Sequence, residues 1–197
     1  MSFVKMIVDL DVFECALARA DHLGDYSLNF KQHLQRKNGE LQAKLEGSLG
    51  EEIVERWLKS NGINFRDDRS EYTHDYSLKE GITLEVKTKV RQVPPNLNYE
   101  CSIPEYTLNM QKANLYVFVS LTEIKNMELS HKKYPEAYIV GVISKSRFQK
   151  LARYWPQGSV DPLNGYVIKK SCYNVFIKEM TAPDKFPDIY RGYLNRR

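Results

Sequence analysis

The sequence has little cysteine, no long apolar run and no signal-peptide pattern. Only three of its 197 residues are cysteines, and the wide spacing of Cys15, Cys101 and Cys172 excludes a disulfide framework or a CxxC zinc site. The longest apolar run lies within residues 115–121, far below the roughly 20 residues that span a bilayer. The first 17 residues carry four charged side chains, unlike a signal peptide. We expect a soluble cytoplasmic protein with free thiols.

The overall charge is nearly balanced. Twenty-nine basic and 25 acidic residues give a net charge of +4, and 42% of the residues are apolar, which is typical of a globular chain with a real core. The length predicts a single domain, with or without an appendage. Basic residues are in excess mainly after residue 86, which suits either a metal site facing phosphates or an ordinary surface.

Hydrophobic periodicity predicts alternating helices and strands. Helices are expected over 12–22, 30–45, 47–61, 105–113 and 145–154, the last with Ser144 as its N-cap. Strands are expected over 63–65, 75–87 as a hairpin, 115–121, 137–143, 165–169 and 173–178. Two consecutive prolines predict a loop over 93–104. The order predicts an α/β core at 47–143, an N-terminal helical arm at 1–46 and a β-rich C-terminal extension at 144–197 packed on the core.

The hairpin carries the most informative residues. A three-residue loop from Lys79 to Gly81, with Gly81 in the left-handed conformation, places Tyr76 opposite Leu84 and Leu78 opposite Ile82. Strand alternation then gives one apolar and one polar face. The apolar face holds Tyr76, Leu78, Ile82, Leu84 and Val86, and the polar face holds Asp75, Ser77, Thr83, Glu85 and Lys87.

This register sets two carboxylates against each other. Asp75 falls opposite Glu85, at a cross-strand distance of about 5 Å. One hard divalent cation could bridge them, with Lys87 beside them. The alternative is a solvated polar face on which Lys87 neutralises the acids, and the hairpin alone does not choose between the two.

The spacing of Asp75 and Glu85-Val86-Lys87 resembles the signature of the PD-(D/E)XK nuclease superfamily, which has the restriction-endonuclease-like fold. The proline of that signature is absent, with His74 in its place, so Asp67 and Asp68 are alternatives to Asp75 that would require a longer loop. The resemblance implies a core of order α-β-β-β-α-β with a mixed sheet flanked by helices, over residues 47–121. Segments 138–145 and 164–166 are reminiscent of phage-type members.

The helix over 47–61 also looks like the first core helix of this superfamily. As in archaeal-type Holliday junction resolvases, an early glutamate precedes an apolar stripe and a terminal glycine. Helical geometry places Glu51 at the margin of that stripe, beside Val54 and Leu58, with Glu55 as its nearest rival. Acids also favour the first turn of any helix, so a purely structural role stays open.

The resemblance implies a role for each matching residue. Asp75, Glu85 and the carbonyl of Val86 would bind Mg²⁺, for which Mn²⁺ is expected to substitute, and Glu51 would join through water. Lys87 would orient or help deprotonate the attacking water. Lys89, Gln111 and Lys112 are expected to contact nucleic acid, although Lys112 could simply be a favourable cation at a helix C-terminus. A further set is either a DNA-facing basic helix or a solvated one: Lys145, Arg147, Lys150, Arg153, Tyr154 and Trp155.

Together these features predict a Mg²⁺-dependent deoxyribonuclease, foremost an endonuclease, in the cytoplasm of a bacterium or a phage-infected host cell. The alternatives are an exonuclease or junction resolvase of the same superfamily, a non-cleaving nucleic-acid-binding module with this fold, or a structural protein whose hairpin matches by coincidence. DNA is the expected partner, and a homodimer is left open.

Overall fold

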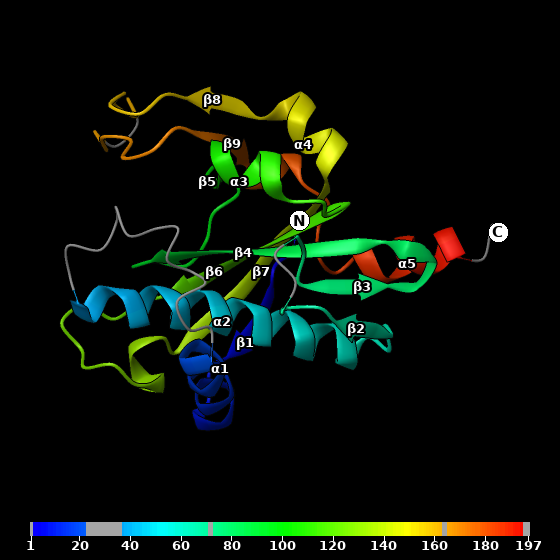
Figure 1. The fold of residues 1–197 in the computed structure, drawn as a ribbon, viewed down its shortest axis with the longest axis horizontal. Coiled ribbons are helices and arrows are strands. Elements are labelled where there is room, and N and C mark those ends of the chain that lie inside the picture. Colours follow the sequence, from blue (N-terminus) through cyan, green and yellow to red (C-terminus); the bar gives the residue numbers. More distant parts are fainter. Residues whose placement is uncertain (1, 23–36, 71–72, 163–164, 195–197) are drawn as a thin grey trace.

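A six-stranded mixed sheet forms the middle layer of the protein (Figure 1), in a computed structural model that describes residues 2–22, 37–70, 73–162 and 165–194. Only β4 and β6 run parallel; the other neighbours are antiparallel. The spatial order is β1 (Val4–Ile7), β7 (Glu136–Ser144), β6 (Leu115–Thr122), β4 (Thr83–Arg91), β3 (Tyr76–Leu78) and β2 (Phe65–Asp67).

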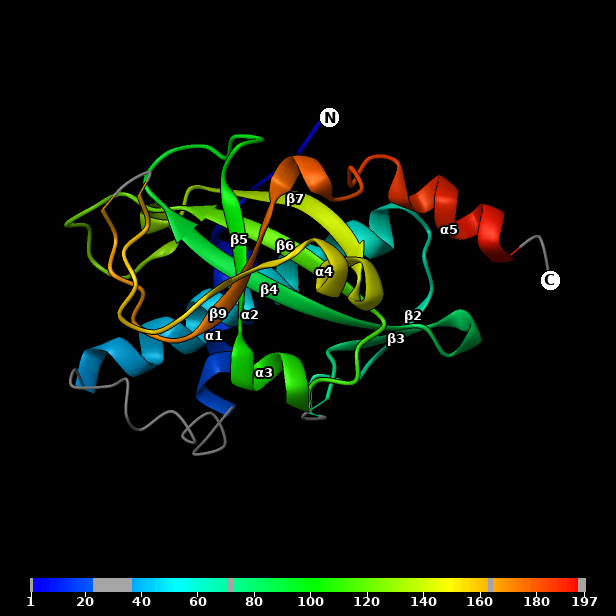
Figure 2. The ribbon, with the colours of Figure 1, turned by 90° about the horizontal axis from the view of Figure 1, so that it is seen from above.

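Two further layers cover the faces of this sheet. On one side lie α1 (Leu10–His22) and the long α2 (Lys37–Ser60) (Figure 1). On the other side lie α3 (Glu105–Met110), α4 (Lys145–Leu151) and a small antiparallel sheet of β5 (Glu100–Pro104), β9 (Cys172–Phe176) and β8 (Arg153–Trp155) (Figure 2). The last helix, α5 (Phe186–Leu194), contacts the β3–β4 turn, where the Lys79 N–H donates to the Tyr190 hydroxyl at 3.1 Å. No described helix has the length and apolarity to cross a membrane.

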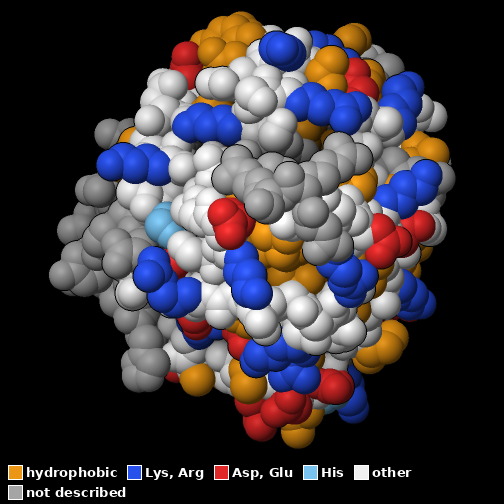
Figure 3. Space-filling model, turned by 90° about the vertical axis from the view of Figure 1, so that its right-hand side faces the viewer, with side chains coloured by type: hydrophobic (Ala, Val, Ile, Leu, Met, Phe, Trp, Pro, Cys, Tyr) orange, Lys and Arg blue, Asp and Glu red, His pale blue; other side chains and the backbone are white. Residues whose placement is uncertain are grey.

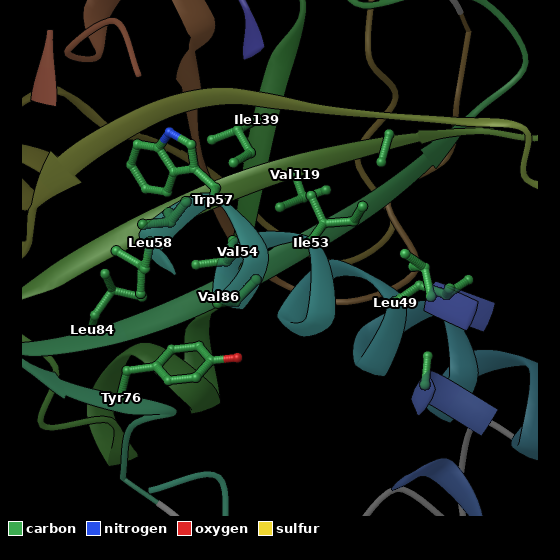
Figure 4. Close-up of a cluster of buried hydrophobic side chains, with 14 of the residues drawn as sticks. Leu49, Ile53, Val54, Trp57, Leu58, Tyr76, Leu84, Val86, Val119 and Ile139 are labelled. Carbon is green, nitrogen blue, oxygen red and sulfur yellow. The ribbon is translucent and has the colours of Figure 1, made fainter. Parts of the chain in front are cut away.

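Alternation along the central strands divides the core in two. On β6, Val117 and Val119 belong to the cluster under α2, whereas Tyr116 and Phe118 belong to the cluster under the small sheet. Figure 4 shows the first cluster, in which side chains of α2 meet those of the strands. Its labelled members include Ile53, Val54, Trp57, Leu84, Val119 and Ile139, all at most 2% exposed. These apolar contacts hold α2 against β4.

Several expected elements are confirmed. The hairpin pairs Tyr76 with Leu84 through the expected turn, and Gly81 has a positive φ of 69°. The buried strands expected over 115–121 and 137–143 are β6 and β7. Ser144 caps α4, because its hydroxyl accepts the Arg147 N–H at 3.3 Å. The sequence therefore predicted the elements with the strongest periodicity.

Two expectations about the N-terminal part of the chain were wrong. The first four-residue strand, β1, was not expected, and it pairs with β7 at the sheet edge. The helices expected over 30–45 and 47–61 form one helix from Lys37 to Ser60, since Gly47 does not interrupt it; residues 30–36 lie outside the described residues. The boundary expected at residue 46 thus falls inside α2.

Three further expectations need correction on the far side of the sheet. The last five residues of the expected loop 93–104 form β5, which tolerates Pro104 at its end. The helices expected over 105–113 and 145–154 end at Met110 and Leu151, because the residues that follow are extended, and 153–155 forms β8. The strand expected over 165–169 is not formed; Val167 makes only an isolated bridge with Val160.

Gly50 sets how closely α2 approaches β4. A Cβ atom there would lie 1.9 Å from the Thr88 Oγ1 on β4. We expect Gly50→Ala to destabilise the fold by about 1–3 kcal/mol through overpacking. Urea denaturation measures the effect.

Gly47 on the same helix is the matched control, since a Cβ there meets nothing within 4 Å. Gly47→Ala should leave the fold unchanged or stabilise it by up to roughly 1 kcal/mol from helix propensity. Equal stability of the two variants would contradict the close approach.

Candidate active site

The β3–β4 ladder ends one residue before the expected Asp75–Glu85 pair. It pairs Tyr76 with Leu84, and the Asp75 N–H then donates to the Leu84 carbonyl at 2.9 Å. The expected cross-strand pairing of Asp75 with Glu85 is therefore wrong, because the two residues are not partners in the β3–β4 ladder. The Asp75 carboxylate instead reaches along β4, where its Oδ2 accepts the Val86 N–H at 2.6 Å. Asp75 thus caps the edge of β4 at the point where β3 leaves it.

Glu85 lies in a buried polar contact on the opposite side of the sheet from α2. The residue is only 8% exposed, so the alternative of a solvated polar face is wrong. Its Oε1 accepts a hydrogen bond from the Lys87 Nζ at 2.7 Å and another from the Gln111 Nε2. One part of that alternative is confirmed, because Lys87 does pair with Glu85. The pair lies inside the protein rather than on a solvated face.

Glu51 approaches the same place from α2. The Tyr76 hydroxyl donates to its backbone carbonyl at 2.8 Å, which ties this turn of the helix to β3. Its carboxylate interacts electrostatically with both Asp75 and Glu85. Glu55, the rival on the same helix, is bound by Lys59 at 2.6 Å and by Arg69. The structure thus brings Glu51, Asp75 and Glu85 together in an acid cluster, named here by these three residues.

Burial and the charges of neighbouring carboxylates disfavour the charged forms of Asp75 and Glu51. Burial raises the pKa of Asp75 well above its ordinary value, and the neighbouring charges of Glu85 and Glu51 raise it further, against the Val86 N–H and Lys87. Burial also raises the pKa of Glu51, although the cations Arg69 and Arg19 oppose this. Asp75 and Glu51 therefore hold protons more tightly than exposed carboxylates do.

Two buried polar atoms beside Glu85 have no hydrogen-bond partner among the described residues, the Gln111 Oε1 and the Tyr116 hydroxyl. Parallel pairing places Tyr116 level with Glu85, and burial with the charge of Glu85 raises the pKa of Tyr116 to about 12. Unpartnered buried oxygens are costly and commonly indicate a bound ion or water. Tyr116 was not among the predicted site residues. Strand alternation was the signal that could have found it, since it places every second residue of β6 on the face that carries Glu85.

The donor set suits a hard cation. Asp75 and Glu85 supply carboxylate oxygens, and the Val86 carbonyl is directed to the edge that Asp75 caps, because N–H and C=O of one strand residue point the same way. Among the residues that the structure describes, however, no three or more His, Cys, Asp or Glu side chains are grouped so that they could hold a metal ion. Instead, Asp75 accepts a hydrogen bond from the Val86 N–H, and Glu85 accepts hydrogen bonds from Lys87 and Gln111.

The two alternatives to Asp75 are engaged by arginines, and the group of Asp67, Arg69 and Arg19 also interacts electrostatically with Glu51. Asp67 accepts hydrogen bonds from Arg69 at 2.6 Å and Arg19 at 3.3 Å, and Arg69 holds the pKa of Asp67 down at about 2. Asp68 is bound by Arg66 at 2.6 Å and contacts the His74 Nε2 at 3.2 Å. Both aspartates are therefore engaged in ion pairs of their own.

The expected nucleic-acid contacts are divided by the structure. Gln111 reaches the acid cluster, whereas the exposed Lys112 lies beyond the end of α3 and its N–H donates to the Thr73 carbonyl at 3.1 Å. Lys112 is not in the last turn of a helix that runs to 113, contrary to the expectation; α3 ends at Met110 with Gln111 as its C-cap, so Lys112 lies just past the helix C-terminus. Lys89 lines a cavity farther along β4.

The basic helix expected over 145–154 is not one surface. The Lys145 Nζ donates to the Gln111 carbonyl at 2.5 Å, so it belongs beside the acid cluster. Arg153 lies on β8, 3.1 Å from Glu179 and with its guanidinium 3.9 Å from the Phe176 ring centroid. Arg147 and Lys150 are exposed. On the end of the molecule that carries α5, cationic and anionic side chains are mixed (Figure 3), so that face offers no continuous basic surface.

No protein-family model matches this chain, and no curated protein matches it. Its function is therefore inferred from the geometry of the acid cluster.

The raised pKa of Asp75 predicts a pH-dependent stability. A carboxyl whose pKa is higher in the folded state favours folding at acid pH, and that contribution is lost as pH rises through the folded pKa. At pH 7, without divalent cations, Asp75→Asn should therefore raise the free energy of unfolding, on the order of 1 kcal/mol. Asparagine keeps an acceptor for the Val86 N–H.

Denaturant titrations between pH 4 and pH 8 test this. The gain in Asp75→Asn should shrink toward pH 4, below which Asp75 is protonated in both states. Asp188→Asn is the control, since that side chain is 85% exposed. A gain that is independent of pH, or equal in the control, would contradict a buried and repelling Asp75.

Proposed function

We propose that the protein is a Mg²⁺-dependent nuclease that hydrolyses phosphodiester bonds of DNA at the acid cluster. One observation carries the proposal: Asp75 just before β3, Glu85 on β4 and Glu51 on α2 interact electrostatically at one edge of β4, with Lys87 bonded to Glu85 at 2.7 Å. Clustered carboxylates with perturbed pKa values are more common at functional sites than elsewhere. The resemblance of Asp75 and Glu85-Val86-Lys87 to the PD-(D/E)XK signature supports the same reaction.

The residue types at the acid cluster suit a magnesium ion, although the described side chains are not grouped around one. Asp75, Glu85 and the Val86 carbonyl would hold it, and Glu51 would join through water, an all-oxygen set of the kind Mg²⁺ prefers. The unpartnered Gln111 Oε1 and Tyr116 hydroxyl next to Glu85 also favour an additional bound group. When bound, the ion supplies a water of lowered pKa and stabilises negative charge on the phosphate.

Lys87 is the residue that connects the acid cluster to a substrate. Its side chain lies on the same face of β4 as Glu85 and is 18% exposed. Bonding to Glu85 holds the ammonium in place before a phosphate arrives. From there Lys87 would orient the attacking water by donating a hydrogen bond and offset the charge that develops on the phosphate.

Gln111 and Lys145 would keep the acid cluster in shape. The Gln111 Nε2 donates to Glu85, and the Gln111 carbonyl accepts from the Lys145 Nζ at 2.5 Å. These two hydrogen bonds hold the rotamer of Glu85 from the side of α3 and α4. Lys145 therefore acts as a positioning residue, and Gln111 has a free amide oxygen with which to meet a substrate or a water.

A non-cleaving binding module is the second candidate, and one observation favours it. Lys87 and Gln111 already satisfy one oxygen of Glu85 within the protein itself, as they would in a purely structural polar cluster. Endonuclease, exonuclease and junction-resolving activities would all use the same residues, so the substrate has to be varied in the test.

The test incubates the protein with supercoiled, linear, single-stranded and branched DNA, with Mg²⁺, with Mn²⁺ or with EDTA. We expect cleavage of at least one substrate that requires the metal and falls by 100-fold or more in Lys87→Ala and Glu85→Gln, in line with losses of about 2.7–4 kcal/mol for groups that stabilise developing charge.

Lys185→Ala is the matched control, because Lys185 is exposed and lies outside the acid cluster. It should cleave like the parent protein. Absence of cleavage on every substrate and with either metal would contradict the nuclease. Metal-dependent cleavage that persists in Glu85→Gln would show that the acid cluster is not the site of cleavage.

A further inference from the structure

A cavity opens where the polar face of β4 continues past the acid cluster. Its volume is about 890 Å³, within the roughly 300–1,000 Å³ of small-molecule pockets. It lies between the end of β4, the small sheet and the segment that leads into β9. Lys89 and Arg91 line it from β4, Ser102 from β5 and Asn174 from β9. Figure 2 shows β5 and β9 lying across the large sheet above β4.

The cavity continues directly from Lys87. Lys87, Lys89 and Arg91 are alternate residues of one strand, so they project from the same face at intervals of roughly 7 Å. Glu85 and Lys87 lie at one end of this row, and Lys89 and Arg91 lie in the cavity at the other end. A chain of phosphates bound at Lys87 would therefore lead into the cavity.

The two cations on β4 form no ion pair with a carboxylate among the described residues. The Lys89 Nζ donates to the Glu100 carbonyl at 3.3 Å, and Arg91 donates to the same carbonyl at 2.7 Å. The Arg91 Nε is buried without a described partner. Lys89 is exposed, and partial desolvation of its ammonium together with the adjacent Arg91 lowers its pKa. An anion in the cavity would offset the repulsion between these two cations and give the Arg91 Nε a partner.

The rest of the lining adds two lysines, two carboxylates and two tyrosine rings. Lys169 and Lys170 bring the cations to four, against the carboxylates of Glu100 and Asp161. Glu100 is already engaged, since it accepts from the Asn174 Nδ2 at 2.7 Å and faces the Arg153 Nε at 3.4 Å.

Tyr99 and Tyr166 line the cavity as well, 36% and 52% exposed. Lysine and arginine side chains beside exposed aromatic rings and amides form the usual combination for phosphates and unstacked bases.

We propose that this cavity binds a single-stranded segment of nucleic acid next to the scissile phosphate, so that the substrate carries unpaired nucleotides on one side of the cleavage point. The link to cleavage rests on the proposed nuclease function, whereas the binding itself does not. The volume accommodates a short unstacked strand but no base-paired duplex. The row of cations on β4 guides the strand from Lys87 into the cavity.

The test measures binding without cleavage. Fluorescein-labelled oligo-dT and oligo-U of 12 nucleotides and a 12-base-pair duplex are titrated by anisotropy in EDTA. The variant Lys89→Gln/Arg91→Gln removes the two cations of β4, and Lys132→Gln/Lys185→Gln removes the same charge from exposed positions elsewhere.

We expect the single strands to bind at least ten-fold tighter than the duplex. The cavity variant should lose ten-fold or more of that affinity. Its slope of log K against log salt should shrink by roughly 0.7 for each phosphate that the variant no longer neutralises. The two oligonucleotides distinguish DNA from RNA as the source of the strand.

Each outcome has one meaning. Equal affinity for duplex and single strand, or a cavity variant that binds like its control, would overturn the proposal even if the protein cleaves DNA. Single-strand binding that the cavity variant loses supports it, even if no substrate is cleaved; in that case only the nuclease function fails. Lys87→Ala should keep most of the binding, because the cavity lies beyond it.

Discussion

The departure of β3 from β4 after the Tyr76–Leu84 pair is the constraint on which the site depends. From Glu85 onward, β4 has a described neighbour strand only on the side of β6, so its other edge presents unpaired backbone groups. The Asp75 carboxylate caps that edge at Val86, at 2.6 Å. The same opening lets Glu51 approach from α2, where the contact of Gly50 with Thr88 holds the helix close. A strand that simply continued its ladder would have left no such opening.

Burial then changes the electrostatic properties of this strand edge. The small sheet and α3 cover the polar face of β4, which brings Glu85 to 8% exposure. In water three neighbouring carboxylates would repel one another weakly, but at a buried edge the repulsion and the lost hydration raise the pKa of Asp75 and Glu51. Lys87 offsets part of the negative charge. A divalent cation would offset the rest, and this is the physical basis of the proposed metal-dependent reaction.

The sequence predicted the parts of the fold that rest on strong local signals. Alternation and Gly81 predicted the hairpin register, and continuous apolar runs predicted β6 and β7. The four- and five-residue strands β1 and β5 were missed, because they gain stability mainly from the strands they pair with. Among candidate site residues, Asp75, Glu85 and Lys87 come from one hairpin, so local spacing was enough to bring them together. Tyr116, and the cavity around Lys89 with its lining from segments about 80 residues apart, depend on tertiary packing that no local pattern records.

Calorimetric titration with Mn²⁺ at neutral pH tests the central claim most directly. Repeating it at lower pH reports the competition between protons and the metal. A metal site at the acid cluster predicts saturable binding that weakens as the pH falls, because protons compete with the metal for Asp75 and Glu51, whose pKa values are raised. It also predicts that Asp75→Asn abolishes this binding. Absence of saturable binding, or the same isotherm in Asp75→Asn, would contradict a metal centre at this strand edge.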